Sequence, residues 1–269
     1  MSPAWRMHPA WWELIRISAR RVLVFRFQIV VWPLRLMVQL YLLRVVWEAV
    51  YDGREAVDGV SGRTLLVFLT ISAIQRFFMP FGIAYTIQER VTTGRVATDL
   101  LRPFGFLKQM VAVQTGMILG FLPILLLVLI PAALLVGSLR VPAVENLLLY
   151  GISLVLAYVV NLLIWMLVGM LAFWMMNSNG VRVMLYIASD FLAGTLVPLW
   201  FMPDALRTTL ELLPFQAGAF LPASIFAGQV TAMAVVRPFL VQTVWIGILL
   251  ACLRIVWSRA QRKLVVQGG

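Results

Sequence analysis

Long apolar segments are the feature that most restricts the folds open to this chain. Most of them run for about 20 to 30 residues, and about 20 apolar residues in a helix cross a hydrocarbon core of about 30 Å. Their apolar residues do not alternate with period two, which argues against a transmembrane β-barrel. Hydrophobic residues make up 62% of the sequence and charged residues 12%, whereas a soluble globular domain is about a quarter charged. The sequence therefore predicts an all-α integral membrane protein.

Six apolar segments are long enough to form transmembrane helices within one transmembrane domain of residues 1–269. The predicted spans cover residues 27–50, 64–85, 109–136, 147–175, 181–200 and 238–257. We expect the helix of the second span to continue toward Thr92. In the third span, Gly116 and Gly120 have the spacing that permits close helix approach.

Residues 9–22, ahead of the first span, have the composition of a helix that lies at the membrane surface. Trp11 and Trp12 suit the depth of the lipid headgroups, and Arg16, Arg20 and Arg21 suit contact with lipid phosphates. The alternative interpretation is that these residues simply begin the first span.

The distribution of positive charge predicts that both termini are cytoplasmic. Six spans place both ends of the chain on one side of the membrane, and most of the 22 lysines and arginines fall in the segments on that side. The opposite side holds only Arg54, Arg63, Arg140, Arg207 and Arg237. Because cytoplasmic loops are enriched in lysine and arginine, the net charge of +11 reflects membrane topology and not nucleic-acid binding.

Several classes of active site are excluded by residue counts. The chain has one cysteine, Cys252, and one histidine, His8, so it holds no intramolecular disulfide, thiolate cluster or histidine-based metal site. It also lacks the G-x4-G-K-[ST] loop that binds nucleotide phosphates. We therefore expect a protein that is not itself an enzyme and carries no cofactor.

Residues 86–105, TIQERVTTGRVATDLLRPFG, form a polar cytoplasmic segment between the second and third spans. Gly94 is expected to end one helix in a left-handed turn, and Pro103 to stop a second, short helix. In that short helix Val96, Leu100 and Leu101 are predicted to share an apolar face, while Arg95 and Asp99, four residues apart, are positioned to pair. The pattern predicts a docking helix beneath the membrane, although many positive-inside loops are also bounded by Gly and Pro.

Residues 201–230, on the outer side, are too apolar for a solvated loop and too broken by prolines for a single span. Leu206, Leu210 and Leu213 are predicted to lie on one face of a first short helix, and a second is expected near residues 223–228. Non-helical backbone at membrane depth must be buried in protein or face water. We therefore expect two short helices that dip into the membrane from outside and return.

Together these two segments resemble the ABC-2 type permeases, the membrane subunits of ATP-binding-cassette exporters. ERVTTGRVATDLLRP, residues 89–103, is similar to the coupling loop of that family. GTLVPLWFMP, residues 194–203, followed by LPF at 213–215 and PASIFAG at 222–228, is similar to the proline-containing signature that precedes its last span. The resemblance covers the whole chain, in the expected order and on the expected sides of the membrane.

The resemblance implies a set of functional residues in each segment. Those implied in coupling to an ATPase are Glu89, Arg90, Gly94, Arg95, Val96, Asp99, Leu100, Leu101, Arg102 and Pro103. Those implied in an outer gate are Gly194, Pro198, Pro203, Pro214, Phe215, Pro222 and Gly228.

The resemblance also implies partners and a mechanism. Two copies of a cytosolic ABC ATPase subunit would bind ATP and Mg and drive a dimer of permeases in the lipid of a bacterial cytoplasmic (inner) membrane. The second permease is either the same chain or a sibling. ATP-driven closure of the ATPases would move the 96–101 helix, the stiff second span would transmit that movement, and Pro80 and Gly82 would let it bend.

Five polar residues inside the predicted spans require partners or a cavity, since a charge at mid-bilayer costs about 2.5–3.5 kcal/mol. They are Gln28, Arg35, Gln39, Arg76 and Asp190. One interpretation is that they line the substrate pathway. The other is that Asp190 forms a structural ion pair with Arg35 or Arg76. Near the outer interface, Arg44 and Glu48 are expected to pair with each other.

Two other functions are compatible with the sequence. One is a proton-driven secondary transporter with Asp190 as the proton carrier, although the chain shows no internal repeat of spans, which that class often has. The other is a scaffolding subunit of a membrane complex. The residues do not identify a transported substrate.

Overall fold

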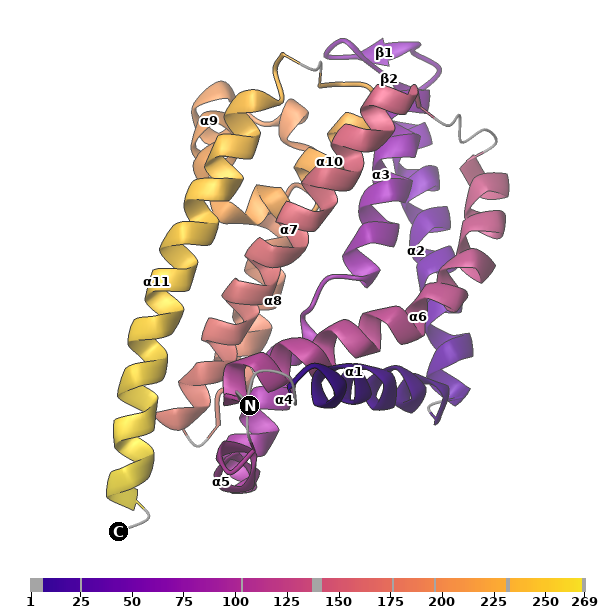
Figure 1. Ribbon diagram of the computed structural model, residues 1–269. Helices are drawn as coiled ribbons and strands as arrows, with labels where there is room; N and C mark the ends of the chain where they lie inside the picture. The colour runs from indigo at the N-terminus through magenta and orange to yellow at the C-terminus, as the bar shows by residue number, and fades with distance from the viewer. Residues whose placement is uncertain are drawn as a thin grey trace.

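The computed structural model describes residues 7–24, 26–102, 104–136, 142–175, 177–195, 197–230 and 233–267. Nearly all of them are helical, and the helices form one bundle whose two chain ends lie at the same end (Figure 1). The helices are α1 (Met7–Val24), α2 (Arg26–Tyr51), α3 (Gly62–Phe77), α4 (Gly82–Thr92), α5 (Arg95–Leu100), α6 (Phe106–Val136), α7 (Val144–Met170), α8 (Asn179–Leu192), α9 (Asp204–Leu212), α10 (Phe220–Phe226) and α11 (Val236–Gln267), with the 3-10 turns η2 (Leu171–Phe173), η3 (Leu199–Phe201) and η4 (Pro214–Gly218).

Within the described residues, five helical segments are long and apolar enough to cross a membrane: Val30–Tyr51, Gly62–Thr92, Phe106–Ile124, Val144–Phe173 and Val236–Lys263. They confirm the all-α membrane class and correspond to five of the six predicted spans.

The remaining predicted span, residues 181–200, is wrong as a continuous helix. Helix α8 has 14 residues and ends at Leu192, a length of about 21 Å at 1.5 Å per residue. Gly194 then adopts a left-handed φ of +65°, and the Thr195 hydroxyl donates to the Asp190 carbonyl oxygen at 2.7 Å. The described residues between Leu192 and Trp200 therefore form a turn and the start of the short η3, a change of direction that apolar composition does not encode.

The second predicted span is interrupted instead of stiff. Helix α3 ends at Phe77 and α4 begins at Gly82, with Pro80 in the break, where a proline has no amide proton to donate. The lower piece, α4, packs against α7 at Gly169, where an added Cβ would lie 2.9 Å from Cβ of Ile87. The lower half of this span is therefore fixed to α7, and the break separates it from α3.

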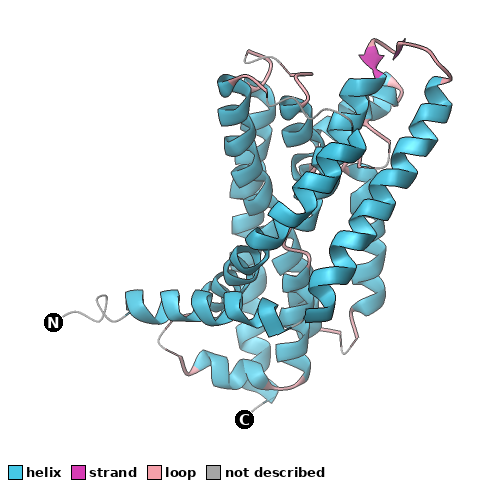
Figure 2. Ribbon diagram, turned by 90° about the vertical axis from the view of Figure 1, so that its right-hand side faces the viewer, coloured by secondary structure: helices cyan, strands magenta, loops and turns pink. Residues whose placement is uncertain are grey.

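Helix α1 lies across the ends of the other helices (Figure 2) and against the first half of α6 (Figure 1). The contact is made at the predicted glycine pair, because a Cβ at Gly116 would meet the Ile15 backbone and one at Gly120 would lie 2.8 Å from Cγ2 of Val22. Residues 9–22 thus form a separate crosswise helix that extends further at both ends, and its location at the membrane surface stays a prediction.

We expect Gly120→Val to detach α1 from α6. The new side chain would meet Ala19 backbone at 2.5 Å, and backbone does not give way as a flexible side chain does, so overpacking should cost about 1–3 kcal/mol. Tryptic release of the α1 segment from the detergent-purified protein should become faster. Gly151→Val in α7 is the matched control, since a Cβ there meets nothing within 4 Å; equal cleavage of the two variants would contradict the packing argument.

A small β-hairpin between α2 and α3 was not expected from the apolar pattern. Strands β1 (Ala56–Val57) and β2 (Val60–Ser61) pair antiparallel. They are joined by Asp58 and Gly59, both with positive φ, the arrangement that an Asp-Gly pair favours in a tight hairpin turn. The hydroxyl of Tyr51 donates to the Val60 carbonyl oxygen at 2.9 Å, which holds the hairpin over the end of α2.

Residues 201–230 contain two short helices, α9 and α10, at the end of the molecule opposite the chain termini (Figure 1). The second begins at Phe220 and not near residue 223 as expected. In α9 the predicted apolar face is incomplete, because Leu210 is buried whereas Leu206 is exposed. Helix α10 is buried over most of its length between α3 and α7, so this backbone is enclosed by protein, as irregular structure at membrane depth requires.

Candidate functional site

The polar segment 86–105 forms a helix–turn–helix at the end of the molecule where the chain termini lie (Figure 1). Helix α4 ends at Thr92, Gly94 takes the predicted left-handed conformation with φ of +73°, and α5 follows at Arg95. Pro103 lies outside the described residues. Gly94 therefore turns the chain between two helices, and any side chain there would be strained.

Asp99 is the buried centre of this segment, with 1% of its surface exposed. Its carboxylate forms an ion pair with Arg90 of α4 and lies 3.5 Å from Nη1 of Arg102. Arg95 pairs with Glu89 at 3.2 Å instead. The predicted Arg95–Asp99 pair is therefore wrong, because Asp99 faces the protein while Arg95 faces away from it.

Gln109 of α6 fixes the same segment and was not identified from the sequence. Its side-chain amide is buried and donates to the backbone carbonyl oxygens of Asp99 at 2.6 Å and Phe104 at 2.9 Å. It also accepts from Arg102 at 3.2 Å. A glutamine at the start of an apolar helix gives no sequence signal for this role, because both acceptors are main-chain oxygens, one in the last turn of α5 and one after it.

The apolar residues at α5 differ in exposure, which corrects the predicted single apolar face. Val96 is 2% exposed and belongs to the core formed with α4, α6 and α7, whereas Leu100 is 40% and Leu101 86% exposed. Val96 thus attaches α5 to the membrane domain. Leu100, one turn later, and Leu101, directly after the helix, remain exposed.

A second polar group lies within the helix bundle. Asp190 of α8 and Arg76 of α3 form an ion pair, which is the structural interpretation of these charges. The Arg76 guanidinium also lies over the rings of Phe81 and Tyr186, at 4.6 and 4.7 Å from their centroids, a geometry that stabilises a cation away from water. In the second half of α2, Arg44 and Glu48 pair at 2.7 Å as predicted.

Arg35 and Gln39 of α2 line the same cavity as Arg76 and Asp190. Four of the five predicted intramembrane polar residues therefore lie together, and the side chain of Gln28 lies outside the described residues. The neighbouring Gln75 donates its side-chain amide to the backbone of Ala219, which links the middle of the bundle to the irregular segment between α9 and α10.

The predicted outer-gate residues are distributed along one continuous stretch. Gly194 and Pro198 occupy the turn after α8. Pro203 directly precedes α9, and Pro214 is the first residue of η4. The others lie deeper or at the end: Phe215 borders a small space beside Arg76, Pro222 is inside α10, and Gly228, with φ of +74°, follows it.

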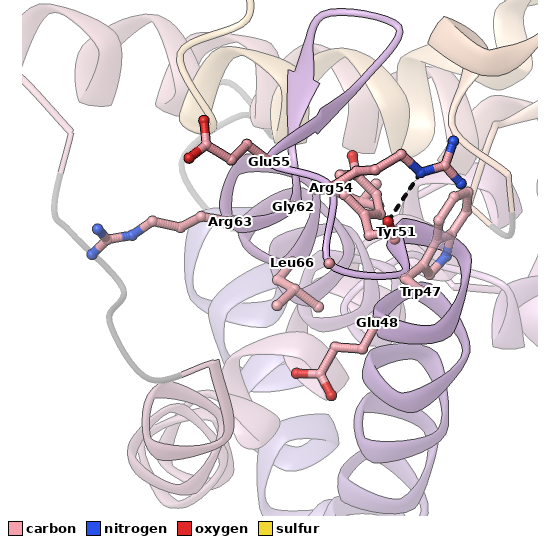
Figure 3. A pocket seen from close by; sticks show the side chains of 10 residues that line it. Trp47, Glu48, Tyr51, Arg54, Glu55, Gly62, Arg63 and Leu66 are labelled. Carbon is pink, nitrogen blue, oxygen red and sulfur yellow. Dashed lines mark hydrogen bonds between the residues drawn. The ribbon is translucent and has the colours of Figure 1, made fainter.

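An open cavity of about 430 Å³ lies between α2, the β-hairpin and α3, at the end of the bundle opposite the chain termini (Figure 3). Trp47, Tyr51 and Leu66 form its apolar wall, and Glu48 and Arg63 stand at its edge. Nε of Arg54 donates to the Tyr51 carbonyl oxygen at 3.1 Å. The charges at this edge have both signs, so the cavity shows no preference for a ligand of one charge.

Comparison with known protein families decides the class. The model of the family described as ABC-2 family transporter protein matches residues 35–268, which is most of the chain and includes both candidate segments. The chain belongs to this family. The comparison with curated proteins gives no match.

As an ABC-2 family protein, the chain is a membrane permease of an ABC transporter. Proteins of this family are transmembrane subunits that work with an ABC ATPase subunit. The match begins at Arg35, so α1 and the first residues of α2 lie outside it.

Proposed function

We propose that the chain is the permease subunit of an ATP-driven exporter in a bacterial inner membrane, and that α5 is the element gripped by the ATPase. The observation that carries this proposal is the exposed pair Leu100 and Leu101, at the end of a short helix that is anchored by the buried Val96 and Asp99. A surface pair of leucines on an anchored helix suits a hydrophobic groove on a partner.

The proposed topology has six crossings with both termini in the cytoplasm. Helix α8 with the turn and η3 after it would make the sixth crossing, with protein rather than lipid covering its irregular part. Support comes from the two chain ends, which lie at the same end of the bundle as α5 (Figures 1 and 2), and from the excess of lysine and arginine in the segments assigned to that side.

Contacts around α5 suggest how movement would pass into the membrane. Arg90 and Gln109 tie α5 to α4 and α6, and α4 packs closely on α7 at Gly169. A pull on α5 would therefore move α4 and α7 together, with the break at residues 78–81 as the hinge. This replaces the stiff second span as the transmission element.

The outer gate would respond because it is attached to the same elements. Gly218 of η4 packs on Asn161 of α7, with no room for a side chain between them, and Gln75 of α3 holds Ala219. Relative movement of α3 and α7 would thus pull on residues 201–230. The functional unit we propose is a dimer of permeases, of this chain or with a sibling, bound to two ATPase subunits that carry ATP and Mg.

The proposal predicts that Leu101→Glu prevents the ATPase from binding. A carboxylate in an apolar groove loses its hydration without gaining a partner, so co-purification with the ATPase encoded beside the permease gene should fall at least tenfold, about 1.4 kcal/mol or more. The variant should still insert, because Leu101 makes little contact within the chain.

Leu206→Glu is the matched control, since Leu206 is also exposed but lies on the opposite side of the membrane in the proposed topology. It should leave co-purification unchanged. Normal recovery of the ATPase with Leu101→Glu, or equal losses with both variants, would contradict the proposal that the ATPase binds α5.

A further inference from the structure

The cavity between α2, α3 and α8 has a composition that selects a ligand. Its volume is about 340 Å³, at the lower end of the range for small-molecule sites. Three charged side chains line it, from three different helices: Arg35, Arg76 and Asp190. The ion pair between Arg76 and Asp190 neutralises two of these charges, so the cavity retains one positive charge, that of Arg35.

Hydrogen-bond donors outnumber acceptors in this cavity. In the part of the chain that the structure describes, Nη2 of Arg76 and Oδ1 of Asp190 are buried without a hydrogen-bond partner, although the two residues form an ion pair. The guanidinium of Arg35, at the exposed edge, adds five N–H donors. The side-chain acceptors are the Asp190 carboxylate, which faces Arg76 in the ion pair, the amide oxygen of Gln39 and the hydroxyl of Tyr186, fewer than the N–H donors of the two arginines. A ligand that complements this surplus presents several anionic oxygens.

The rest of the cavity wall is apolar, and its surroundings are membrane helices. Trp32, Leu36, Ala73 and Phe77 form this wall. On either side, α2 and α8 expose apolar residues: Leu34 and Val38 on α2, Met184 and Ile187 on α8. The cavity has room for a headgroup and the first carbons of a chain, while a longer chain would extend along these exposed surfaces.

We propose that this cavity binds the anionic headgroup of an amphiphile, with Arg35 as the principal ligand of the anion. The inference names a substrate class for the proposed export pathway and so rests on the proposed function. Arg76 is held in place by Asp190 and by the rings of Phe81 and Tyr186. Its guanidinium therefore has a fixed position and offers the ligand a second hydrogen-bond donor.

The test compares three lipids with identical dioctanoyl chains, bound to the full chain purified in a maltoside detergent and measured by native mass spectrometry. Their headgroups are phosphatidylglycerol (anionic), phosphatidylcholine (zwitterionic) and trimethylammonium (cationic). We expect phosphatidylglycerol to bind about tenfold more tightly than phosphatidylcholine, because both carry the anionic phosphate but the positive charge of Arg35 repels the choline cation. Equal binding of the three, or tightest binding of the cationic lipid, overturns the proposal, and this comparison needs no variant that must fold.

Variants then locate the site. Arg35→Gln should reduce the preference for phosphatidylglycerol to about twofold or less, and Arg35→Lys should retain most of it. Arg44→Gln is the matched control, because it removes the same charge from the same helix outside the cavity, and it should leave the preference intact. Equal losses in Arg35→Gln and Arg44→Gln would show general attraction to positive surface and overturn the proposed site.

A further arm separates a lipid from a soluble anion. Glycerol phosphate, which has the headgroup chemistry without the chains, should not displace phosphatidylglycerol at equal concentration. Displacement would overturn the amphiphilic part of the proposal. The lipid measurement uses the permease without its ATPase, so the two proposals can fail separately. No preference for phosphatidylglycerol together with normal ATPase co-purification would overturn this inference alone. Failure of the co-purification test together with a normal lipid preference would overturn the proposed function alone.

Discussion

Replacing Asp99 with lysine is expected to unfold the α4–α5 turn and uncouple the permease from its ATPase. The side chain is buried between Arg90 and Arg102, so a lysine would bring three cations together in a site with little water. Removing one partner of a buried ion pair costs about 3–5 kcal/mol, and reversing the charge adds repulsion. Substrate-stimulated ATP hydrolysis in reconstituted vesicles should fall to the basal rate, while membrane insertion persists.

Glu55→Lys provides the matched control, because it makes the same change of charge at an exposed residue just before β1, at the end of the molecule opposite α5. A charge reversal at an exposed position away from α5 should leave stimulation near normal. Stimulated hydrolysis that survives in Asp99→Lys would show that the buried network does not support coupling, and similar losses in both variants would point to the net charge of the protein.

Local sequence signals predicted the outline of this segment but not its contacts. Gly94 identified the turn, since only a residue that tolerates positive φ suits a helix end of this kind. The partners of Asp99 depend on how α5 is rotated against α4 and α6, however, and a spacing of four residues favours Arg95 and Asp99 equally well on any exposed helix. The choice of Arg90 instead is a tertiary effect, fixed by the burial of Val96 and by the main-chain contacts of Gln109.

Hydropathy had a similar limit for the membrane helices. It found the segments that contain α2, α6, α7 and α11, because length and apolar composition are what a membrane crossing demands. It could not distinguish α8 from a full span, since the residues after Leu192 are just as apolar and differ only in backbone path. The break at Pro80 was accessible from the sequence as a bend, whereas the packing of α4 on α7 depends on Gly169 and Ile87 meeting across the bundle.

The ion pair within the bundle bears on the choice between an ATP-driven and a proton-driven transporter. A proton carrier must exchange its partner when it takes up a proton, and Asp190 forms an ion pair with Arg76, so the two functions predict different results when the charge of Asp190 is removed. We expect Asp190→Asn to leave Arg76 without a counter-ion and to destabilise the folded protein by about 3–5 kcal/mol. Thermal unfolding in detergent should show a lowered midpoint, and a second substitution, Arg76→Leu, should recover much of the loss because the unpaired charge is gone.

The same purified proteins provide a control for the stability measurement and a test of the proton-driven transporter. Glu211→Gln removes a carboxylate from the pair with Arg207, of which both side chains are partly exposed, so its midpoint should change little. In vesicles, transport by the wild type should stop on ATP depletion and persist with an uncoupler. The opposite outcome has two parts: wild-type transport responds to the proton gradient, and Asp190→Asn is stable but has lost that response. This outcome would assign Asp190 as the proton carrier, because an amide retains the shape of the carboxylate but cannot take up its proton.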